Sequence, residues 1–266
     1  MIMLNILSLF FYIVAFILFL LFYFKNKNFV ITLAISFTIM GIISNLVFII
    51  IRWNELGFFP TVTFSDTLIF LAFIIAVLFI FFYFIYKNIH IFIFIIPFLS
   101  ILIIIALLLN FNTKVDIEKG SLLLYIHLPF SITGTALFFL SASAGIMYFY
   151  QEKQLKNKNL NFINKQLLSL DSINKITNNL LIFGFIIFTI GLITGFIWRF
   201  YAENIEKYSY QTKLIFSVIT WCIFGALIFI KKVKGLPPKK LAMGSIIGFV
   251  CLIVTYIGLA IFLSGK

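Results

Sequence analysis

Charge is scarce in this sequence. Only 11% of the 266 residues are charged, and the mean hydropathy is +1.18, whereas about 25% of the residues of a soluble domain are charged. A water-soluble fold is therefore excluded. The remaining charge is mostly of one sign, with 8 acidic residues against 20 Lys and Arg. Because these cations lie mainly in short connections between apolar runs, they indicate membrane topology, and we exclude nucleic-acid binding.

Cysteine and histidine are equally rare. Cys222 and Cys251 lie far apart inside apolar runs, which excludes a CxxC redox pair and a cysteine-based metal motif. The two histidines, His90 and His127, stand at the ends of apolar runs, and we expect them on opposite sides of the membrane. A lone interfacial histidine is more often solvated than a metal ligand, and this is our interpretation of His90.

Ionisable side chains are absent from the expected middle of every membrane span. Transporters that couple transport to protons or ions normally need such a group, so this class is disfavoured. A small-solute transporter or channel would need a polar pathway through the membrane. An intramembrane cavity lined by Ser36, Thr38 and Asn45 would favour that alternative.

Long apolar runs dominate what is present, with 63% hydrophobic residues and 37 phenylalanines. A helix needs about 20 apolar residues to cross a hydrocarbon core about 30 Å thick. The runs therefore predict an all-α fold, a polytopic transmembrane helical bundle of about eight helices that forms a single domain over residues 1–266. The expected spans are residues 4–24, 30–51, 67–86, 91–110, 122–150, 179–200, 213–230 and 241–263.

The sidedness of the chain follows from its Lys and Arg residues. Most of them fall in the first, third, fifth and seventh connections between spans, which the positive-inside rule places in the cytoplasm. Both termini are then expected outside. Gly184, Gly191 and Gly195 recur at a spacing that allows helix backbones to approach closely, so we expect them to serve helix packing.

The expected outer side collects an unusual set of side chains. A porphyrin with two carboxylates needs an axial nitrogen, flat apolar walls and cations for its propionates. An aromatic belt at the membrane interface is the simpler interpretation of the aromatic residues alone. The candidate set is His127 for the iron, Arg52 and Arg199 for the propionates, and Trp198, Tyr208, Tyr210, Phe216 and Trp221 for the walls.

Several segments resemble one known family when taken in order. Arg52-Trp53 with Gly57 and Pro60, followed by residues 64–71, resembles the RW…G.FP…LYESL.FL signature of the cytochrome c assembly family, which comprises CcsA, ResC and HemX-like haem-handling membrane proteins. Other segments are similar to later motifs of that family, and the likeness extends over residues 52–265. These segments are Tyr125-Ile-His127, Gly191 to Trp198, Ile219-Thr220-Trp221 and Gly248-Phe249 with Tyr256-Ile-Gly258.

The resemblance implies a haem-handling component of cytochrome c biogenesis in the cell membrane. In this interpretation His127 is the axial ligand of a haem presented on the outer side, and the chain delivers that haem for attachment to apocytochrome c. The expected partners are membrane lipid, apocytochrome c and another cytochrome assembly subunit. The resemblance implies a component of a haem-attachment system, and not an enzyme in its own right.

The sequence also departs from the family pattern. Where the family has several tryptophans between its two flanking motifs, this chain has Tyr208, Tyr210 and Phe216, and Phe229 stands where an inner histidine is expected. A second outer histidine, expected past the last span, does not occur within the 266 residues. A second hypothesis therefore stays open, a HemX-like membrane regulator or scaffold that binds no haem.

Overall fold

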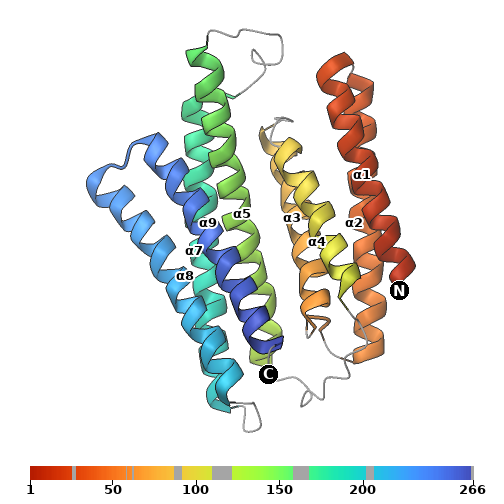
Figure 1. The fold of residues 1–266 in the computed structure, drawn as a ribbon, viewed down its shortest axis with the longest axis vertical. Helices are drawn as coiled ribbons and strands as arrows, with labels where there is room; N and C mark the ends of the chain where they lie inside the picture. The colour runs from red at the N-terminus through yellow and green to blue at the C-terminus, as the bar shows by residue number, and fades with distance from the viewer. Residues whose placement is uncertain are drawn as a thin grey trace. The chain divides into compact units, whose positions relative to one another are not determined.

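The computed structural model describes the backbone of residues 1–25, 28–57, 59–61, 63–86, 92–109, 122–157, 168–201 and 207–264. This part of the chain holds eight α-helices and no β-strand (Figure 1). The all-α membrane fold predicted from the sequence is confirmed. The helices are α1 Ile2–Lys25, α2 Asn28–Leu56, α3 Phe64–Tyr86, α4 Phe92–Leu108, α5 Leu122–Lys156, α7 Leu170–Tyr201, α8 Lys207–Lys234 and α9 Pro238–Ser264.

The described helices fall into two compact units, which we call the N-terminal unit, Met1–Gly120, and the C-terminal unit, Ser121–Lys266. The first contains α1 to α4 and the second contains α5, α7, α8 and α9. Within the described residues, α1, α2, α3, α5, α7 and α8 are each long and apolar enough to cross a membrane. The chain is therefore a multi-pass membrane protein.

Two helices extend beyond the apolar runs from which they were predicted. α5 has 35 residues, and at 1.5 Å per residue it measures about 52 Å, well beyond the apolar core of a bilayer. α7 begins at Leu170, nine residues before the expected start, because Ser169 caps it. The Ser172 N–H donates to Ser169 Oγ at 3.1 Å, and Asp171 lies in the first turn. Hydropathy misses the first turns of α7 because their side chains are mostly polar.

The N-terminal unit packs α1 against α2 and α3 against α4. An edge of the Tyr12 ring lies against Gly41, where an added Cβ would stand only 2.6 Å from Tyr12 Cε1. Asn45 Nδ2 donates to the Tyr12 hydroxyl at 3.1 Å, so this contact is polar as well as close. Ser65 Oγ on α3 donates to the Ala106 carbonyl on α4 at 2.6 Å. Polar side chains therefore join neighbouring helices of this unit inside the membrane.

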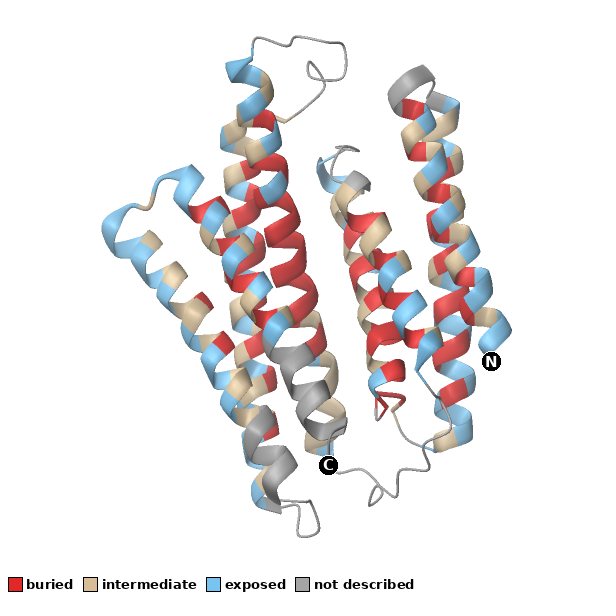
Figure 2. Cartoon of the chain, in the orientation of Figure 1, coloured by how far each residue is buried: buried red, intermediate tan, exposed pale blue. Residues whose placement is uncertain are grey.

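The C-terminal unit is built around α5, which packs against α7 and α9. Nearly all residues from 132 to 148 are buried, and Figure 2 shows this as a continuous red stretch along the helix. An added Cβ at Gly134 would lie 2.6 Å from Phe188 Cβ and 2.8 Å from its Cα. The rings of Phe138 and Phe224 stack at a centroid distance of 3.7 Å. Glycines and stacked rings thus bring the helices of this unit into close contact.

Candidate functional site

The imidazole of His127 lies in the second turn of α5 and contacts α7. Its Nδ1 is 2.7 Å from the carbonyl oxygen of Gly191. A carbonyl oxygen can only accept a hydrogen bond, so Nδ1 must carry the hydrogen. In the neutral ring Nε2 is then left with its lone pair, and it has no polar contact among the described residues. A metal-binding histidine has this arrangement, with one nitrogen held by an acceptor and the other available.

The close approach of α5 and α7 at this point depends on two glycines of α7. A Cβ on Gly195 would overlap the imidazole ring of His127. A Cβ on Gly191 would stand 2.5 Å from Ser131 Oγ and 2.7 Å from the Ser131 nitrogen. The helix-packing role predicted for these glycines is therefore confirmed. At Gly195 the imidazole ring of His127 fills the space that a side chain would occupy.

Two hydroxyls lie beside the His127 hydrogen bond. Ser131 Oγ is 3.3 Å from His127 Nδ1, and since Nδ1 carries the hydrogen, Ser131 can only share it as a weak acceptor. Thr194 Oγ1 donates to the Gly191 carbonyl at 3.0 Å and to the Ile190 carbonyl at 2.8 Å. Sequence reasoning missed both residues. The signal for Ser131 was its spacing of four from His127, which places it on the same helix face.

The other candidates of the C-terminal unit come from the same end of its helices. α5 begins, α7 ends and α8 begins at one end of the unit, as Figure 1 shows. Trp198 and Arg199 lie in the last turn of α7, half-buried, three and four residues past Gly195. Phe216 is half-buried on α8. The expectation that these residues share one end with His127 is therefore met within this unit.

Trp221 contacts α7 on a different face. Its indole Nε1 donates to Thr189 Oγ1 at 2.9 Å, and its ring stacks on Phe185 at a centroid distance of 5.4 Å. Positions two apart on a helix project about 200° from each other, which separates Thr189 from Gly191. Trp221 therefore packs α8 on α7 through Thr189 and Phe185. Its role as a haem wall stays a prediction.

Three predicted positions fall where the structure describes less. Tyr208 and Tyr210 lie in the first turns of α8, but their side chains are outside the described residues. His90 is also outside them. The roles assigned to the two tyrosines and to His90 therefore stay predictions.

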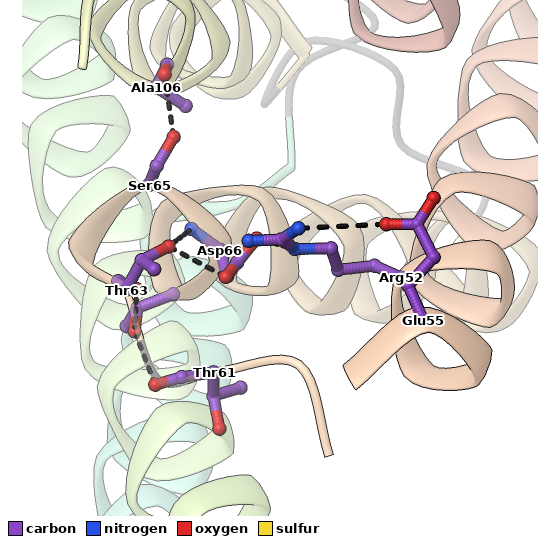
Figure 3. A network of polar contacts seen from close by, with 8 residues as sticks. Arg52, Glu55, Thr61, Thr63, Ser65, Asp66 and Ala106 are labelled. Carbon is purple, nitrogen blue, oxygen red and sulfur yellow. Dashed lines mark hydrogen bonds and ion pairs between the residues drawn. The ribbon is translucent and has the colours of Figure 1, made fainter. Parts of the chain in front are cut away.

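Arg52 belongs to the N-terminal unit, at the end of α2, and is only 7% exposed. Its Nε donates to Asp66 Oδ1 at 3.3 Å, and its Nη1 lies 3.6 Å from Glu55 Oε2 (Figure 3). Sequence reasoning assigned this guanidinium to a propionate. The structure instead gives it two carboxylate neighbours of its own chain.

Thr63 and Asp66 form the cap of α3 that holds this ion pair. The Asp66 N–H donates to Thr63 Oγ1 at 3.0 Å, and the Thr63 hydroxyl donates to Asp66 Oδ2 at 2.6 Å. Gly57, with φ of 73°, follows the last residue of α2 and lets the chain turn toward this cap. The segment that resembles the family signature thus builds the junction of α2 and α3. The Thr-x-x-Asp spacing was the sequence signal for it.

The three residues that would line a solute pathway donate hydrogen bonds to groups of the N-terminal unit. Ser36 Oγ donates to the Thr32 carbonyl and Thr38 Oγ1 to the Ala34 carbonyl, each within α2. Asn45 Nδ2 donates to Tyr12. In the residues that the structure covers, no group of three or more His, Cys, Asp and Glu side chains could hold a metal ion. His127 therefore belongs to no such group among the described residues.

The chain is similar to known proteins over most of its length. A family model described as Cytochrome C assembly protein matches residues 61–265. The cytochrome c biogenesis protein CcsA of Chlamydomonas reinhardtii is 24% identical over 241 residues, which are 85% of this chain and 66% of that protein. CcsA of Prochlorococcus marinus (strain NATL1A) is 29% identical over 123 residues, 44% of this chain and 39% of that protein. CcsA of Cyanophora paradoxa is 35% identical over 95 residues, 34% of this chain. The chain spans less than two thirds of the length of these relatives.

Proposed function

Because the chain belongs to the cytochrome c assembly protein family, we propose that it is a haem-binding membrane component of cytochrome c biogenesis with His127 as its axial ligand. The observation that carries the proposal is the hydrogen bond from His127 Nδ1 to the Gly191 carbonyl. That bond leaves Nε2 of the half-buried imidazole with its lone pair, and Nε2 has no polar partner among the described residues. A nitrogen in this state suits the iron of a haem.

The residues of the chain would perform two tasks at such a site. The Gly191 carbonyl orients the imidazole and makes Nε2 a stronger donor, which is the usual effect of an acceptor behind a ligating histidine. Trp198 and Phe216, half-buried at the same end of the unit, would supply apolar walls. A bound haem would contribute the iron and the vinyl groups that react with apocytochrome c thiols, and the chain would hold and present it.

The two arginines lie in different surroundings. Arg52 is buried beside Asp66 and Glu55, so its charge is largely compensated. Arg199 is half-buried in the last turn of α7, four residues past Gly195. The assignment of each arginine to a propionate stays a prediction.

The proposal includes partners and a location. We propose that the chain lies in the cell membrane with the His127 end of its C-terminal unit on the outer side, among membrane lipids. There it would act with another cytochrome assembly subunit and present haem to apocytochrome c. The distribution of Lys and Arg along the sequence supports this orientation.

Haem titration of the purified protein tests the proposal. The full chain in detergent is expected to bind haem with a Soret band, and His127→Ala is expected to abolish or strongly shift that band. His90→Ala is the matched control, since the chain has only two histidines and His90 is not assigned to the site. No Soret band in the intact protein, or identical spectra for the intact protein and His127→Ala, would reject the proposal.

A second candidate function rests on Phe229. This residue stands where the resemblance expects an inner histidine, and it is 66% exposed on α8. A HemX-like membrane regulator or scaffold, which keeps the helices and binds no haem, accommodates that substitution. The nearby genes discriminate the two, because genes for cytochrome maturation support haem delivery and genes for tetrapyrrole synthesis support regulation.

A further inference from the structure

We infer that the α7 segment Gly191-Leu-Ile-Thr-Gly195 positions His127, because its carbonyl selects the tautomer of the imidazole and its second glycine leaves the space for the ring. The role of this segment toward iron rests on the proposed function. The tautomer itself is a property of the chain and can be measured without haem. Gly191, Thr194 and Gly195 are therefore positioning residues, which act on a ligand through His127.

The first step is the choice of tautomer. An isolated neutral imidazole in water carries its hydrogen on either nitrogen, and hydrogen-bond partners decide which form a protein holds. The Gly191 carbonyl accepts from Nδ1 at 2.7 Å, a short distance for an N–H donor. If the hydrogen were on Nε2, the lone pair of Nδ1 would face a lone pair of the Gly191 carbonyl oxygen, and the two would repel. The contact therefore commits Nε2 to the role of acceptor or metal ligand.

The second step is the space for the ring. The α5 and α7 backbones are so close that a Cβ on Gly195 would overlap His127 Nδ1 and Cε1. The ring is rigid, so it can yield only by rotating away or by separating the helices. Either movement lengthens the bond to Gly191. Gly195 is thus needed for the orientation of the imidazole as well as for helix packing.

The third step concerns the hydroxyl that shares the acceptor. The single hydroxyl hydrogen of Thr194 is shared between the Ile190 carbonyl at 2.8 Å and the Gly191 carbonyl at 3.0 Å. Two donors to one carbonyl divide its accepting capacity, so the His127 bond is weaker than it would be alone. Removal of the Thr194 hydroxyl is expected to strengthen the His127 bond. A stronger bond makes a ligating imidazole more basic and favours ferric over ferrous iron.

Nitrogen NMR of the protein without haem tests the tautomer. In a His90→Gln background His127 is the single histidine, so ¹⁵N-histidine labelling reports one ring. At a pH where the ring is neutral, we expect a protonated Nδ1 and a bare Nε2. Gly195→Ala is expected to move the spectrum toward a mixture of tautomers. A protonated Nε2 in the unsubstituted segment would overturn the inference.

Haem binding by the same variants gives the second readout. Gly195→Ala is expected to weaken haem binding about 10–100-fold, the usual cost of disturbing a partner of a ligating histidine. Thr194→Val is expected to keep haem and to shift its reduction potential to a more negative value. Gly184→Ala is the matched control, because its Cβ would meet Phe138 and Leu137 at 3.0–3.1 Å in the same helix pair, away from His127.

The outcomes separate the inference from the proposed function. If His127→Ala binds haem as well as the intact chain, the proposed function fails while the tautomer result stands on its own. If haem binding needs His127 but Gly195→Ala and Gly184→Ala bind equally well, the inference fails and the proposed function stands. Circular dichroism and thermal unfolding of both glycine variants verify that each is folded.

Discussion

The two units of this protein handle polar groups inside a membrane in different ways. In the N-terminal unit, two contacts between helices join side chains, Arg52 with Asp66 and Asn45 with Tyr12, while Ser65 donates to the backbone carbonyl of Ala106. In the C-terminal unit, the bonds between α5 and α7 run to backbone carbonyls, from His127 to Gly191 and from Ser141 to Thr177. The Arg52–Asp66 ion pair compensates the charge of both partners. A backbone acceptor satisfies one nitrogen of an imidazole and leaves the other for a ligand.

The glycines at helix contacts also differ between the two units. Gly41 in the N-terminal unit admits an aromatic side chain, the ring of Tyr12. Gly134 and Gly191 in the C-terminal unit admit the backbone of the neighbouring helix, at Phe188 and at Ser131. Close backbones are what bring the Gly191 carbonyl within reach of His127. The side-chain pairs of the N-terminal unit therefore hold helices together, whereas in our proposal the Gly191 carbonyl of the C-terminal unit positions a ligand.

Removal of one ion-pair partner is the largest expected effect. Asp66→Ala leaves Arg52 buried without its nearest carboxylate, and a broken buried pair costs about 3–5 kcal/mol. We expect a large fall in the free energy of unfolding, measured in mixed micelles with increasing SDS. Glu55→Ala is the control, since its side chain is 45% exposed and such pairs contribute under about 1 kcal/mol. Equal losses from the two variants would contradict the buried role of Asp66.

Replacement of a helix-contact glycine by alanine should lower the free energy of unfolding more in the C-terminal unit than in the N-terminal unit. Gly134→Ala is expected to lower the free energy of unfolding by about 1–3 kcal/mol, the usual range for overpacking, because the new methyl meets the Phe188 backbone. Gly41→Ala meets only the edge of the Tyr12 ring, which can shift, so we expect a smaller loss. Thermal unfolding of the two variants in one detergent measures the difference. A larger loss of stability from Gly41→Ala than from Gly134→Ala would contradict this difference between the two units.

Two asparagines of the N-terminal unit should respond in opposite directions. Asn5 is fully buried, and neither polar atom of its amide has a partner in the described part of the chain. Asn5→Leu is therefore expected to raise the free energy of unfolding by about 1 kcal/mol, since an unsatisfied amide is replaced by an apolar group of similar size. Asn45→Leu removes the bond to Tyr12 and is expected to lower it by a similar amount. Destabilisation by both variants would show that Asn5 has a bound partner, such as water.

The smallest effect is expected at the start of α7. Lys175 and Asp171 form an ion pair at 2.8 Å, but their side chains are 71% and 69% exposed. Water and salt screen such a pair, in contrast to Arg52 and Asp66. We expect Lys175→Gln to leave the unfolding midpoint unchanged within experimental error at 150 mM salt. A shift as large as that of Asp66→Ala would show that exposure does not explain the difference between the pairs.

Most of the helices could be predicted from the sequence, because apolar length is a direct signal in a membrane protein. The boundaries were less accurate where a helix leaves the apolar region, as at Leu170, since a polar helix surface has the composition of a loop. The grouping of the helices into two compact units was not anticipated. It depends on which helix faces contact each other, and apolar runs do not specify this.

The sequence named the candidate residues but could not reveal their contacts. His127 could be named because it is one of two histidines and stands in a segment resembling a known motif. Its acceptor on Gly191 is a main-chain group 64 residues away, which no side-chain pattern reveals. Arg52 was assigned to a propionate from its charge and its expected outer position, and its contact with Asp66 became apparent only from the structure of the α2–α3 junction.

Composition and the order of apolar runs alone determined that this chain is a helical membrane protein, because a bilayer accepts little else from such residues. They also singled out His127 as a rare nitrogen donor. Only the tertiary structure decided which of its two nitrogens is available, because that depends on the approach of α7 to α5. The backbones come close enough for a 2.7 Å hydrogen bond where α7 carries glycine instead of a side chain.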